Sequence, residues 1–429
     1  MVRYLQPAAG PLKGEMTVPG DKSVSHRSIM LGSLAEGTTR IRHFLKGEDC
    51  LRTIDCFRKM GISIREENGE VFVEGKGLDG LNPPGEDLYV GNSGTTMRLM
   101  AGILAGQTFE SVLDGDASIR QRPMKRVITP LTDMHAKIRS LDRQDYAPLA
   151  ISPSALRGIR YASPVASAQV KSCILLAGLY ADSAVTVTEP ALSRDHTERM
   201  LRAFGAEVET GQNAVAVKPR PVLRGTDIEI PGDISSAAYF IAAASIVPGS
   251  EILLRGTGIN PTRDGILRIA GRMGADITFH NRRETGGEPV ADILVRYSSL
   301  KGVDISGDII PALIDELPVI AVMAAFAQGR TRIADAAELK VKESDRIAVM
   351  TENLRKMGVD VVPTEDGMII EGGKPLKGAV IDTRLDHRVA MSFAVASLAA
   401  EGKTGLNGAE CVNISYPGFY ETLSGLAGR

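Results

Sequence analysis

Apolar and polar positions repeat along the chain in one order. A nearly all-apolar stretch of helical length is followed by a Gly-containing turn and a strand in which Thr or Ser is flanked by strand-forming residues. Successive copies lie roughly 70 residues apart, which is typical of an internal repeat. A helix that is apolar on every side has to be buried, so these stretches predict helices inside the protein. The six predicted helices cover residues 25–36, 95–105, 169–181, 235–247, 315–328 and 388–401.

A second, more polar helix and a β-hairpin follow each apolar helix. Clear examples of the polar helix are residues 51–59, 197–204 and 346–356. Asn-Gly, Gly-Gln-Asn and Asp-Gly turns join the strands that come next, as is usual in hairpins. This order predicts an α/β protein of six βαβαββ units, three in each of two domains, with the hairpins facing solvent. Six unrelated helix-turn-strand pieces are the alternative, which the recurrence of position and residue type disfavours.

A repeated sequence motif indicates where the two domains join. The sequence PGDISSAAYF at 231–240 is similar to PGDKSVSHRS at 19–28. We therefore expect an inserted domain of three units at residues 21–232. A second domain carries both termini, at residues 1–20 and 233–429, and its last unit is cut short by the C-terminus. The strand before Pro19 should belong with the later half of the chain. A length of 429 residues fits two domains of ordinary size.

Composition narrows the class of protein without identifying it. The chain is 43% hydrophobic and 24% charged, enough for a large core. Its net charge of −2 gives no overall attraction to nucleic acid or to an anionic membrane. No secretory signal precedes Gly10, and the longest apolar stretches are shorter than the ~20 residues of a membrane span. Four cysteines without C-x-x-C spacing or a His partner fit a reducing compartment, so we expect a cytoplasmic protein.

Polar and cationic residues stand at the start of several apolar helices. The segments are 21–27, 92–98, 167–171 and 386–388. Free N–H groups and the helix dipole let helix N-termini bind anions, and Gly94 would allow an anion close to the backbone. A cation at such an end opposes the dipole, so it contributes little to stability. One such end alone is more often structural, but several in equivalent positions predict a site for a polyanion. The cations are Lys22, Arg27, Arg98 and Arg388, and Lys171 lies in the segment that begins at Ser167.

Two further basic segments lie at 120–126 and 340–346, and the second also contains carboxylates. A lone run of charged residues is usually a solvent-exposed face. This segment differs because Glu343 stands between Lys342 and Arg346 at the start of a helix, and arginine binds carboxylates and phosphates bidentately. Asp315 and Glu316 open an otherwise apolar helix, and an N-cap role for Asp315 fits the spacing equally well. Two carboxylates among cations are the groups needed for general acid–base chemistry on an anionic substrate.

Missing motifs exclude several other chemistries. The sequence has no G-x-x-x-x-G-K-[ST] loop and no strand-linked G-x-G-x-x-G, so nucleotide-phosphate loops are not indicated. No His, Cys and Asp cluster has metal-ligand spacing. His26 and His387 each adjoin an Arg, and both a packed imidazole and a ligand contact remain open.

Seven segments occur in the order and at the spacing of one family. They are PGDKSVSHR, GNSGTTMR, RQRPMKRV, SAQVKS, IDELPVIAV, VKESDR and DHRVAM. Across essentially its whole length the chain resembles the EPSP synthase family. The resemblance implies the enolpyruvyl transferase fold, a two-domain inside-out α/β barrel with helices inside, sheets outside and substrates in the interdomain cleft. It also implies enolpyruvyl transfer from phosphoenolpyruvate to the 5-hydroxyl of shikimate 3-phosphate, in aromatic amino acid biosynthesis, without a metal or organic cofactor.

The resemblance assigns roles to individual residues. Asp315 is the implied proton acceptor, and Glu343, with Lys22, the implied proton donor. Shikimate 3-phosphate would contact Lys22, Ser23, Arg27, Ser167, Ala168, Gln169, Arg194, Asp315 and Lys342. Phosphoenolpyruvate would contact Lys22, Asn92, Gly94, Thr95, Arg122, Gln169, Arg346 and Arg388. We expect a monomer that binds these two substrates and neither nucleic acid nor membrane.

Four positions depart from part of the family. Ala168 stands where many members have Ser, Glu338 where one subclass has Asn, and Ile414 where that subclass has Lys. Ser-Ala-Gln at 167–169, together with Arg-Pro-Met-x-Arg-Val at 122–127, instead resembles the second subclass of the family. Because Ile414 replaces the lysine, a fourth cation on phosphoenolpyruvate is not accounted for. Glyphosate-resistant members of the second subclass have Ala at the position of Gly94, so the chain is expected to be glyphosate-sensitive.

The sequence disfavours three alternative functions. A UDP-N-acetylglucosamine enolpyruvyl transferase needs a reactive Cys where Ala117 stands. An RNA 3′-phosphate cyclase would call for a nucleotide-handling His and a basic face, against the net charge of −2. A catalytically inactive anion-binding module would be favoured by the loss of Asp315 or Glu343, and both are present.

Overall fold

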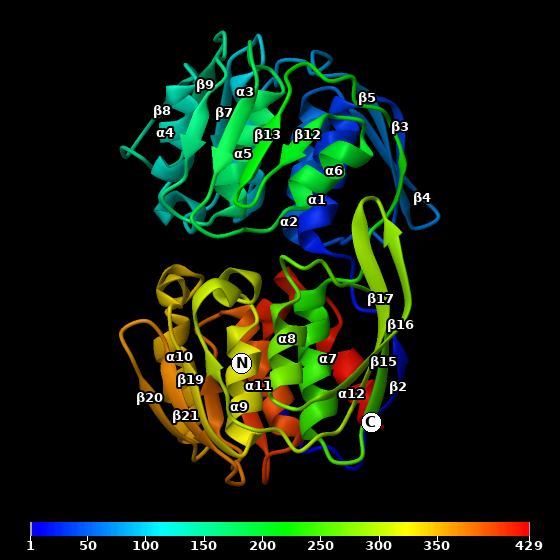
Figure 1. Ribbon diagram of the computed structural model, residues 1–429, viewed down its shortest axis with the longest axis vertical. Helices are drawn as coiled ribbons and strands as arrows, with labels where there is room; N and C mark the ends of the chain where they lie inside the picture. Colours follow the sequence, from blue (N-terminus) through cyan, green and yellow to red (C-terminus); the bar gives the residue numbers. More distant parts are fainter. Residues whose placement is uncertain (1, 429) are drawn as a thin grey trace. The chain divides into compact units, whose positions relative to one another are not determined.

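The computed structural model describes residues 2–428 and divides the chain into two compact units (Figure 1). Unit 1 comprises Met1–Pro19, Gly232–Arg283 and Pro289–Arg429. Unit 2 comprises Gly20–Pro231 and Glu284–Glu288. Met1 and Arg429, which the predicted domain with both termini includes, lie outside the described residues.

Unit 2 contains three four-stranded sheets of the same design. In each, the first two strands are parallel and the other pairs are antiparallel. The first sheet has the order β14 (Asp227–Glu229), β3 (Glu36–Arg42), β5 (Glu70–Lys76), β4 (Ser63–Glu67). The second has β6 (Leu88–Tyr89), β7 (Ser111–Asp114), β9 (Leu149–Ser152), β8 (Lys137–Ser140). The third has β10 (Arg160–Ala162), β11 (Val185–Thr188), β13 (Ala214–Val217), β12 (Val208–Thr210).

Unit 1 repeats this design with the help of the N-terminal segment. Its sheets are β2 (Lys13–Met16), β15 (Glu251–Gly258), β17 (Glu288–Arg296), β16 (Asp276–Thr285), then β18 (Asp304–Ile305), β19 (Gly329–Ile333), β21 (Met368–Gly372), β20 (Asp360–Pro363), then β22 (Val380–Asp382), β23 (Thr404–Asn407), β1 (Val2–Leu5). β1 is antiparallel to β23, and β2 is parallel to β15. The strand segment before Pro19 thus pairs with strands from the later half of the chain.

The nearly all-apolar helices lie in the interior of each unit, as their pattern predicts. In unit 1 these are α7 (Ile234–Ile246), α9 (Leu317–Phe326) and α11 (His387–Leu398), which contact one another. In unit 2 they are α1 (Lys22–Leu34), α3 (Gly94–Ala105) and α5 (Ala168–Gly178). Every residue of α7 is buried, and each unit has its own hydrophobic core. Both units are therefore α/β barrels turned inside out, with helices inside and sheets outside (Figure 1).

The more polar helices complete the repeats. They are α2 (Glu48–Lys59), α4 (Lys125–Asp133) and α6 (His196–Ala203) in unit 2, and α8 (Gly265–Arg272) and α10 (Arg346–Lys356) in unit 1. Short 3-10 helices lie at η1 (Ile119–Gln121), η2 (Gly307–Ala312), η3 (Ala337–Val341) and η4 (Ala409–Ile414). In the sixth repeat α12 (Phe419–Leu426) follows where the other repeats have a hairpin, so that sheet has three strands.

One hairpin tip departs from the expectation that hairpins face solvent. Glu284–Glu288, the turn between β16 and β17, groups with unit 2, whereas the rest of both strands groups with unit 1. The Glu288 side chain is buried against His196, with Nδ1 and Oε1 2.8 Å apart. Burying an acid requires a partner, and the sequence of the hairpin alone does not show that α6 supplies one.

Candidate active site

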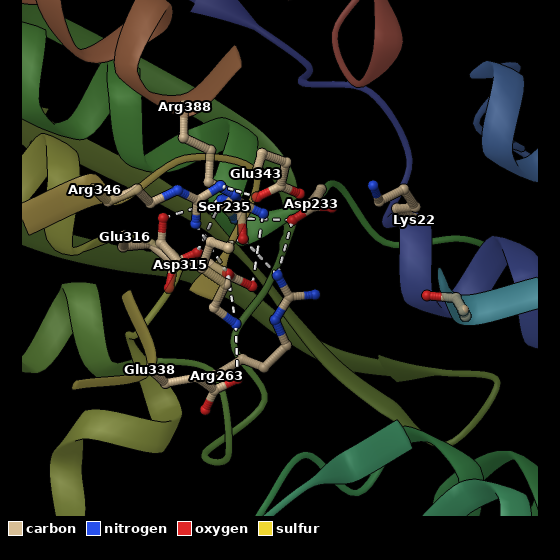
Figure 2. Close-up of polar contacts among 12 residues, drawn as sticks. Lys22, Asp233, Ser235, Arg263, Asp315, Glu316, Glu338, Glu343, Arg346 and Arg388 are labelled. Atoms are coloured by element: carbon tan, nitrogen blue, oxygen red, sulfur yellow. Dashed lines mark hydrogen bonds and ion pairs between the residues drawn. The ribbon is translucent and has the colours of Figure 1, made fainter. Parts of the chain in front are cut away.

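In unit 1 the starts of three helices bring charged side chains together around Asp315 (Figure 2). Lys342 Nζ lies 3.9 Å and Arg346 Nη1 3.6 Å from Asp315 Oδ1, and Arg388 Nη2 lies 3.6 Å from Oδ2. The N-cap alternative for Asp315 is wrong, because α9 has Glu316 at the N-cap position and no side-chain cap bond. The Asp315 carboxylate therefore lies within 4 Å of three cations.

Asp386 fixes both Arg346 and the first turn of α11. Its Oδ1 accepts hydrogen bonds from the backbone N–H groups of Arg388 and Val389, which makes it the N-cap. Its Oδ2 lies 2.8 Å from Arg346 Nε. Arg346 is only 1% exposed, and buried charges require pairing of this kind. The pairing holds Arg346 and Arg388, both predicted from the sequence, at adjacent helix starts.

Glu343 forms the other ion pair of Arg346, with Oε2 2.6 Å from Nη2. Burial acts to raise the pKa of Glu343, but the charges of Arg346, His387 and Arg388 lower it well below its usual range. Glu343 is therefore ionised in this arrangement. An anion bound to Arg346 and Arg388 would offset two of the charges that keep its pKa low.

Four polar residues of this cluster were not among the predicted site residues. Arg263 Nη2 donates to Ser235 Oγ at 2.5 Å and lies 3.2 Å from Asp233 Oδ1. The Ser235 hydroxyl donates to Glu316 Oε1, which lies 3.7 Å from Arg388 Nη1. The repeated Pro-Gly-Asp phrase indicated Asp233 and Ser235 as a helix start equivalent to 21–23, whereas no sequence signal pointed to Arg263.

In unit 2 the start of α1 carries Lys22, Ser23 and Arg27. Lys22 Nζ lies 3.1 Å from Asp49 Oδ2. Arg27 is buried and donates to Thr197 Oγ1 at 2.7 Å and to the Ser23 carbonyl at 3.0 Å. A third bond, 2.8 Å long, goes from Arg27 Nη2 to the hydroxyl of Ser172 on α5. Burial lowers the pKa of Arg27 to about 10, although the nearby carboxylates act in the opposite direction.

The starts of α3 and α5 contact one another through Gln169. Its Oε1 accepts from Arg98 Nη1 at 2.6 Å, and its Nε2 donates to Thr95 Oγ1 at 3.3 Å. A Cβ at Gly94 would lie 2.9 Å from Arg98 Nη1 and 3.3 Å from Arg122 Nη1. Glycine at this position therefore leaves room beside two guanidinium groups. The predicted residues Gly94, Thr95, Arg122 and Gln169 are brought together, and Asn92 Oδ1 beside them is buried without a hydrogen-bond partner in the described chain.

Lys171, in the first turns of α5, is paired with two buried carboxylates. Its side chain is 2% exposed, and Nζ lies 2.9 Å from Glu189 Oε2 and 2.8 Å from Glu198 Oε1. Glu189 also accepts a hydrogen bond from the Ser167 backbone N–H at 3.1 Å, and Lys171 donates to the Ser193 carbonyl at 3.2 Å. This cluster fixes the loop that carries Arg194 beside the start of α5. The paired acids come from distant segments, so the sequence did not reveal it.

His26 is a packed imidazole. It is fully buried in α1, and its Nδ1 lies 2.7 Å from Thr53 Oγ1. Burial lowers the pKa of His26 to about 3, so it is neutral at pH 7. Thr53 continues the hydrogen bonding to Thr96 and from there to Ser93, the N-cap of α3. The imidazole thus joins α1, α2 and α3 in the core.

Residues 2–428 contain neither a candidate metal site nor a candidate membrane-spanning helix. No group of three or more His, Cys, Asp or Glu side chains is arranged to hold a metal ion. No helix in the same range has the length and apolar character needed to cross a membrane.

The fold defines the class of protein. The solved enolpyruvyl transferase NikO from Streptomyces tendae superimposes on this chain with a TM-score of 0.82 at 17% identity, covering 99% of this chain and 97% of that one. A likeness at that identity concerns the fold alone, and it confirms the enolpyruvyl transferase fold expected from the sequence.

The family follows from closer relatives. The profile of EPSP synthase (3-phosphoshikimate 1-carboxyvinyltransferase) matches residues 7–423. The 3-phosphoshikimate 1-carboxyvinyltransferase of Geotalea uraniireducens is 56% identical, with 99% of each chain covered, and that of Brevibacillus brevis is 55% identical over 99% of each. A solved EPSP synthase from Acinetobacter baumannii has a TM-score of 0.91 at 50% identity, covering 99% of this chain and 97% of that one. The chain belongs to the EPSP synthase family, as its motifs indicated.

Proposed function

We propose that Asp315 and Glu343 carry out the proton transfers of the EPSP synthase reaction (EC 2.5.1.19) in this chain. The reaction transfers the enolpyruvyl group of phosphoenolpyruvate to the 5-hydroxyl of shikimate 3-phosphate. The hydroxyl oxygen adds to C2 while C3 gains a proton. A proton then leaves C3 as phosphate departs, which gives 5-enolpyruvylshikimate 3-phosphate. The site residues of the two units divide these tasks.

The observation that carries the proposal is the position of Asp315 among Lys342, Arg346 and Arg388, each within 4 Å. The two arginines are suited to hold the carboxylate and phosphate of phosphoenolpyruvate, because guanidinium groups bind such anions bidentately. Lys342 and Asp315 then face the acceptor hydroxyls. With the cations engaged by substrate, Asp315 is the carboxylate that accepts the proton of the 5-hydroxyl.

Glu343, assisted by Lys22, is the proposed proton donor to C3. Its ion pair with Arg346 keeps it ionised in the free protein. Phosphoenolpyruvate on Arg346 and Arg388 would offset those charges, so the pKa of Glu343 would rise toward its usual value when substrate binds. Binding of phosphoenolpyruvate would thus raise the pKa of Glu343 and favour the protonated form that can donate to C3.

Unit 2 supplies the binding groups that do not transfer protons. Arg27, Ser167, Ala168, Gln169 and Arg194, together with Ser23, are proposed to bind shikimate 3-phosphate. Asn92, Gly94, Thr95 and Arg122 are proposed to bind phosphoenolpyruvate, with Gln169 shared between the substrates. Fixed cations and backbone N–H groups would stabilise the anionic tetrahedral intermediate, an effect that often dominates catalysis. We also infer a cytoplasmic monomer; the four cysteines, all buried free thiols, support a reducing compartment.

Phosphate release by the purified protein tests the proposal. Phosphoenolpyruvate is supplied with shikimate 3-phosphate or, in parallel, with UDP-N-acetylglucosamine. Release with shikimate 3-phosphate alone is expected, and Asp315→Ala should lower kcat by about 10³-fold. Glu338→Gln is the matched control, because Glu338 also pairs with Lys342, at 2.9 Å, but is exposed. Release only with the nucleotide sugar, or an equal loss in both variants, would contradict the proposal.

A further inference from the structure

The buried tip of the β16–β17 hairpin adjoins the residues that hold Arg27. Glu288 and His196 are each 2% exposed, and the hydrogen bond between His196 Nδ1 and Glu288 Oε1 joins the tip to the first residue of α6. The next residue, Thr197, accepts the hydrogen bond of Arg27 Nε and lies 2.6 Å from the hydroxyl of Ser172. One side chain of the tip therefore fixes the turn of helix that orients Arg27.

Two further contacts hold the tip in place. Arg199 Nη1 donates to the Gly287 carbonyl at 3.2 Å, and Thr285 Oγ1 donates to the Glu229 carbonyl at 3.1 Å. Gly287 has a φ of +82°, and a Cβ there would lie 3.0 Å from the Arg199 carbonyl oxygen. The close approach of the tip to α6 thus requires glycine at this position.

The charge of Glu288 also reaches Arg27. Burial lowers the pKa of Arg27, and Glu288 is one of the carboxylates that oppose this effect. A buried cation needs such compensation to remain charged and able to bind an anion. Glu284, at the other end of the tip, is exposed and has no comparable buried contact.

We propose that Glu288 is a positioning residue for the phosphate-bearing acceptor, acting through His196 and Thr197 to hold Arg27 in its binding orientation. The inference rests on the proposed role of Arg27 toward shikimate 3-phosphate. It assigns a binding function to a hairpin whose strands belong to unit 1. A merely structural role would lower stability without favouring one substrate over the other.

Substrate-specific binding separates these two roles. Calorimetry measures the Kd of shikimate 3-phosphate, and steady-state assays give KM for each substrate. Glu288→Ala is expected to raise the Kd and KM of shikimate 3-phosphate about tenfold, with KM for phosphoenolpyruvate and kcat changed less than about twofold. Glu288→Gln, which keeps an acceptor oxygen, should return the Kd to within about threefold of wild type. Glu284→Gln is the matched control and should behave as wild type.

A double variant tests the route through α6. Thr197→Val alone should also raise the Kd of shikimate 3-phosphate, because it removes the acceptor for Arg27 Nε. If Glu288 acts through Thr197, the effects of the two substitutions are not additive. The variant with both Glu288→Ala and Thr197→Val should then have a Kd for shikimate 3-phosphate no higher than that of the single variant with the higher Kd. His196→Gln replaces Glu288→Ala in this cycle if the latter does not fold.

The outcomes distinguish the inference from the function on which it rests. An unchanged Kd in Glu288→Ala, equal rises in both KM values, or additive effects in the double variant would overturn the positioning role. A wild-type protein that neither binds nor turns over shikimate 3-phosphate would instead overturn the proposed function.

Discussion

Helices α1 of unit 2 and α7 of unit 1 begin alike and carry different chemistry. Both follow Pro-Gly-Asp, and each Asp is the N-cap: Asp21 accepts from a backbone N–H at 2.9 Å, and Asp233 at 2.8 Å. At equal distances from the cap, α1 has Lys22, His26 and Arg27 where α7 has isoleucine, alanine and tyrosine. One helix is charged along its buried first turns, and the other is almost entirely apolar.

Unit 1 obtains its charges from other elements. Arg263 reaches the cap of α7 from the loop before α8, and Glu316 and Arg388 come from the starts of α9 and α11. In unit 2 the cations instead stand on the helix and are held by hydroxyls and carbonyls. Equivalent helix starts therefore carry their own cations in unit 2 and receive charges from neighbouring elements in unit 1, and the fold alone does not decide between these arrangements.

The sharpest test exchanges one carboxylate in each unit for its amide. Glu343→Gln in unit 1 removes the proposed proton donor and should lower kcat about 10³-fold, or about 4 kcal/mol. Asp49→Asn removes the ion-pair partner of Lys22 in unit 2 and should lower kcat less than about tenfold. Phosphate release gives kcat, and deuterium entering C3 in heavy water reports the proton transfer. Equal losses of kcat in the two variants would contradict the proposal that proton transfer belongs to unit 1 and binding to unit 2.

The second test concerns the buried cation of unit 2. Lys171→Met leaves Glu189 and Glu198 buried without their partner, so the free energy of unfolding should fall by about 3 kcal/mol. Urea denaturation followed by circular dichroism measures this, since the chain has no Trp. Lys137→Met, at an exposed position on β8, is the control. Replacing both glutamates by glutamine in the Lys171→Met protein should restore most of the loss; no restoration would contradict the pairing argument.

The third test uses pH, because only α1 of this pair buries an imidazole. The pKa of His26 is lowered from 6.5 to about 3 in the folded protein, so below pH 6.5 the unfolded chain binds the extra proton. Stability from this group is complete above pH 6.5 and is lost as pH falls toward 3, by about 3 kcal/mol near pH 4.5. His26→Asn should flatten this part of the stability–pH curve. His280→Asn, at an exposed position on β16, should leave it unchanged, and equal curves for both variants would contradict the assignment.

The smallest expected effect lies at the start of α3. Gly94→Ala places a methyl group 2.9 Å from Arg98 Nη1, so that guanidinium has to shift, and the shift would disturb its bond to Gln169. KM for phosphoenolpyruvate and the inhibition constant of glyphosate should each rise about tenfold, or about 1.4 kcal/mol. Inhibition assays against phosphoenolpyruvate measure both. A millimolar constant in the wild type would contradict the sensitivity expected from Gly94.

The sequence predicted the repeating architecture because its signal is periodic. The six apolar helices were located within a few residues, as in α11, expected at 388–401 and observed at His387–Leu398. Cap residues such as Asp386 determine where the helices begin. Helix ends fray, so the hydrophobic pattern does not predict the last helical residue.

Contacts between distant segments could not be predicted in this way. The sequence around Lys171 does not show whether its side chain binds a ligand or pairs with two buried acids from other elements. Asp315 has the spacing of a cap, but the observed start of α9 one residue later frees its carboxylate for Arg346 and Arg388. The Glu-Thr-Gly-Gly-Glu tip reads as a solvent-exposed turn, and only the position of His196 reveals that Glu288 is buried.

The pairing of β1 with β23 has a consequence for synthesis on the ribosome. Leu5 is opposite Thr404, so the first strand emerges long before its partner exists. At about 5–20 residues per second, the nascent chain waits roughly 20–80 s for that partner. Gly20–Pro231, in contrast, forms a continuous stretch that can collapse into most of unit 2 during this interval. Unit 2 therefore has the opportunity to fold first, while the last sheet of unit 1 closes only when translation is nearly complete.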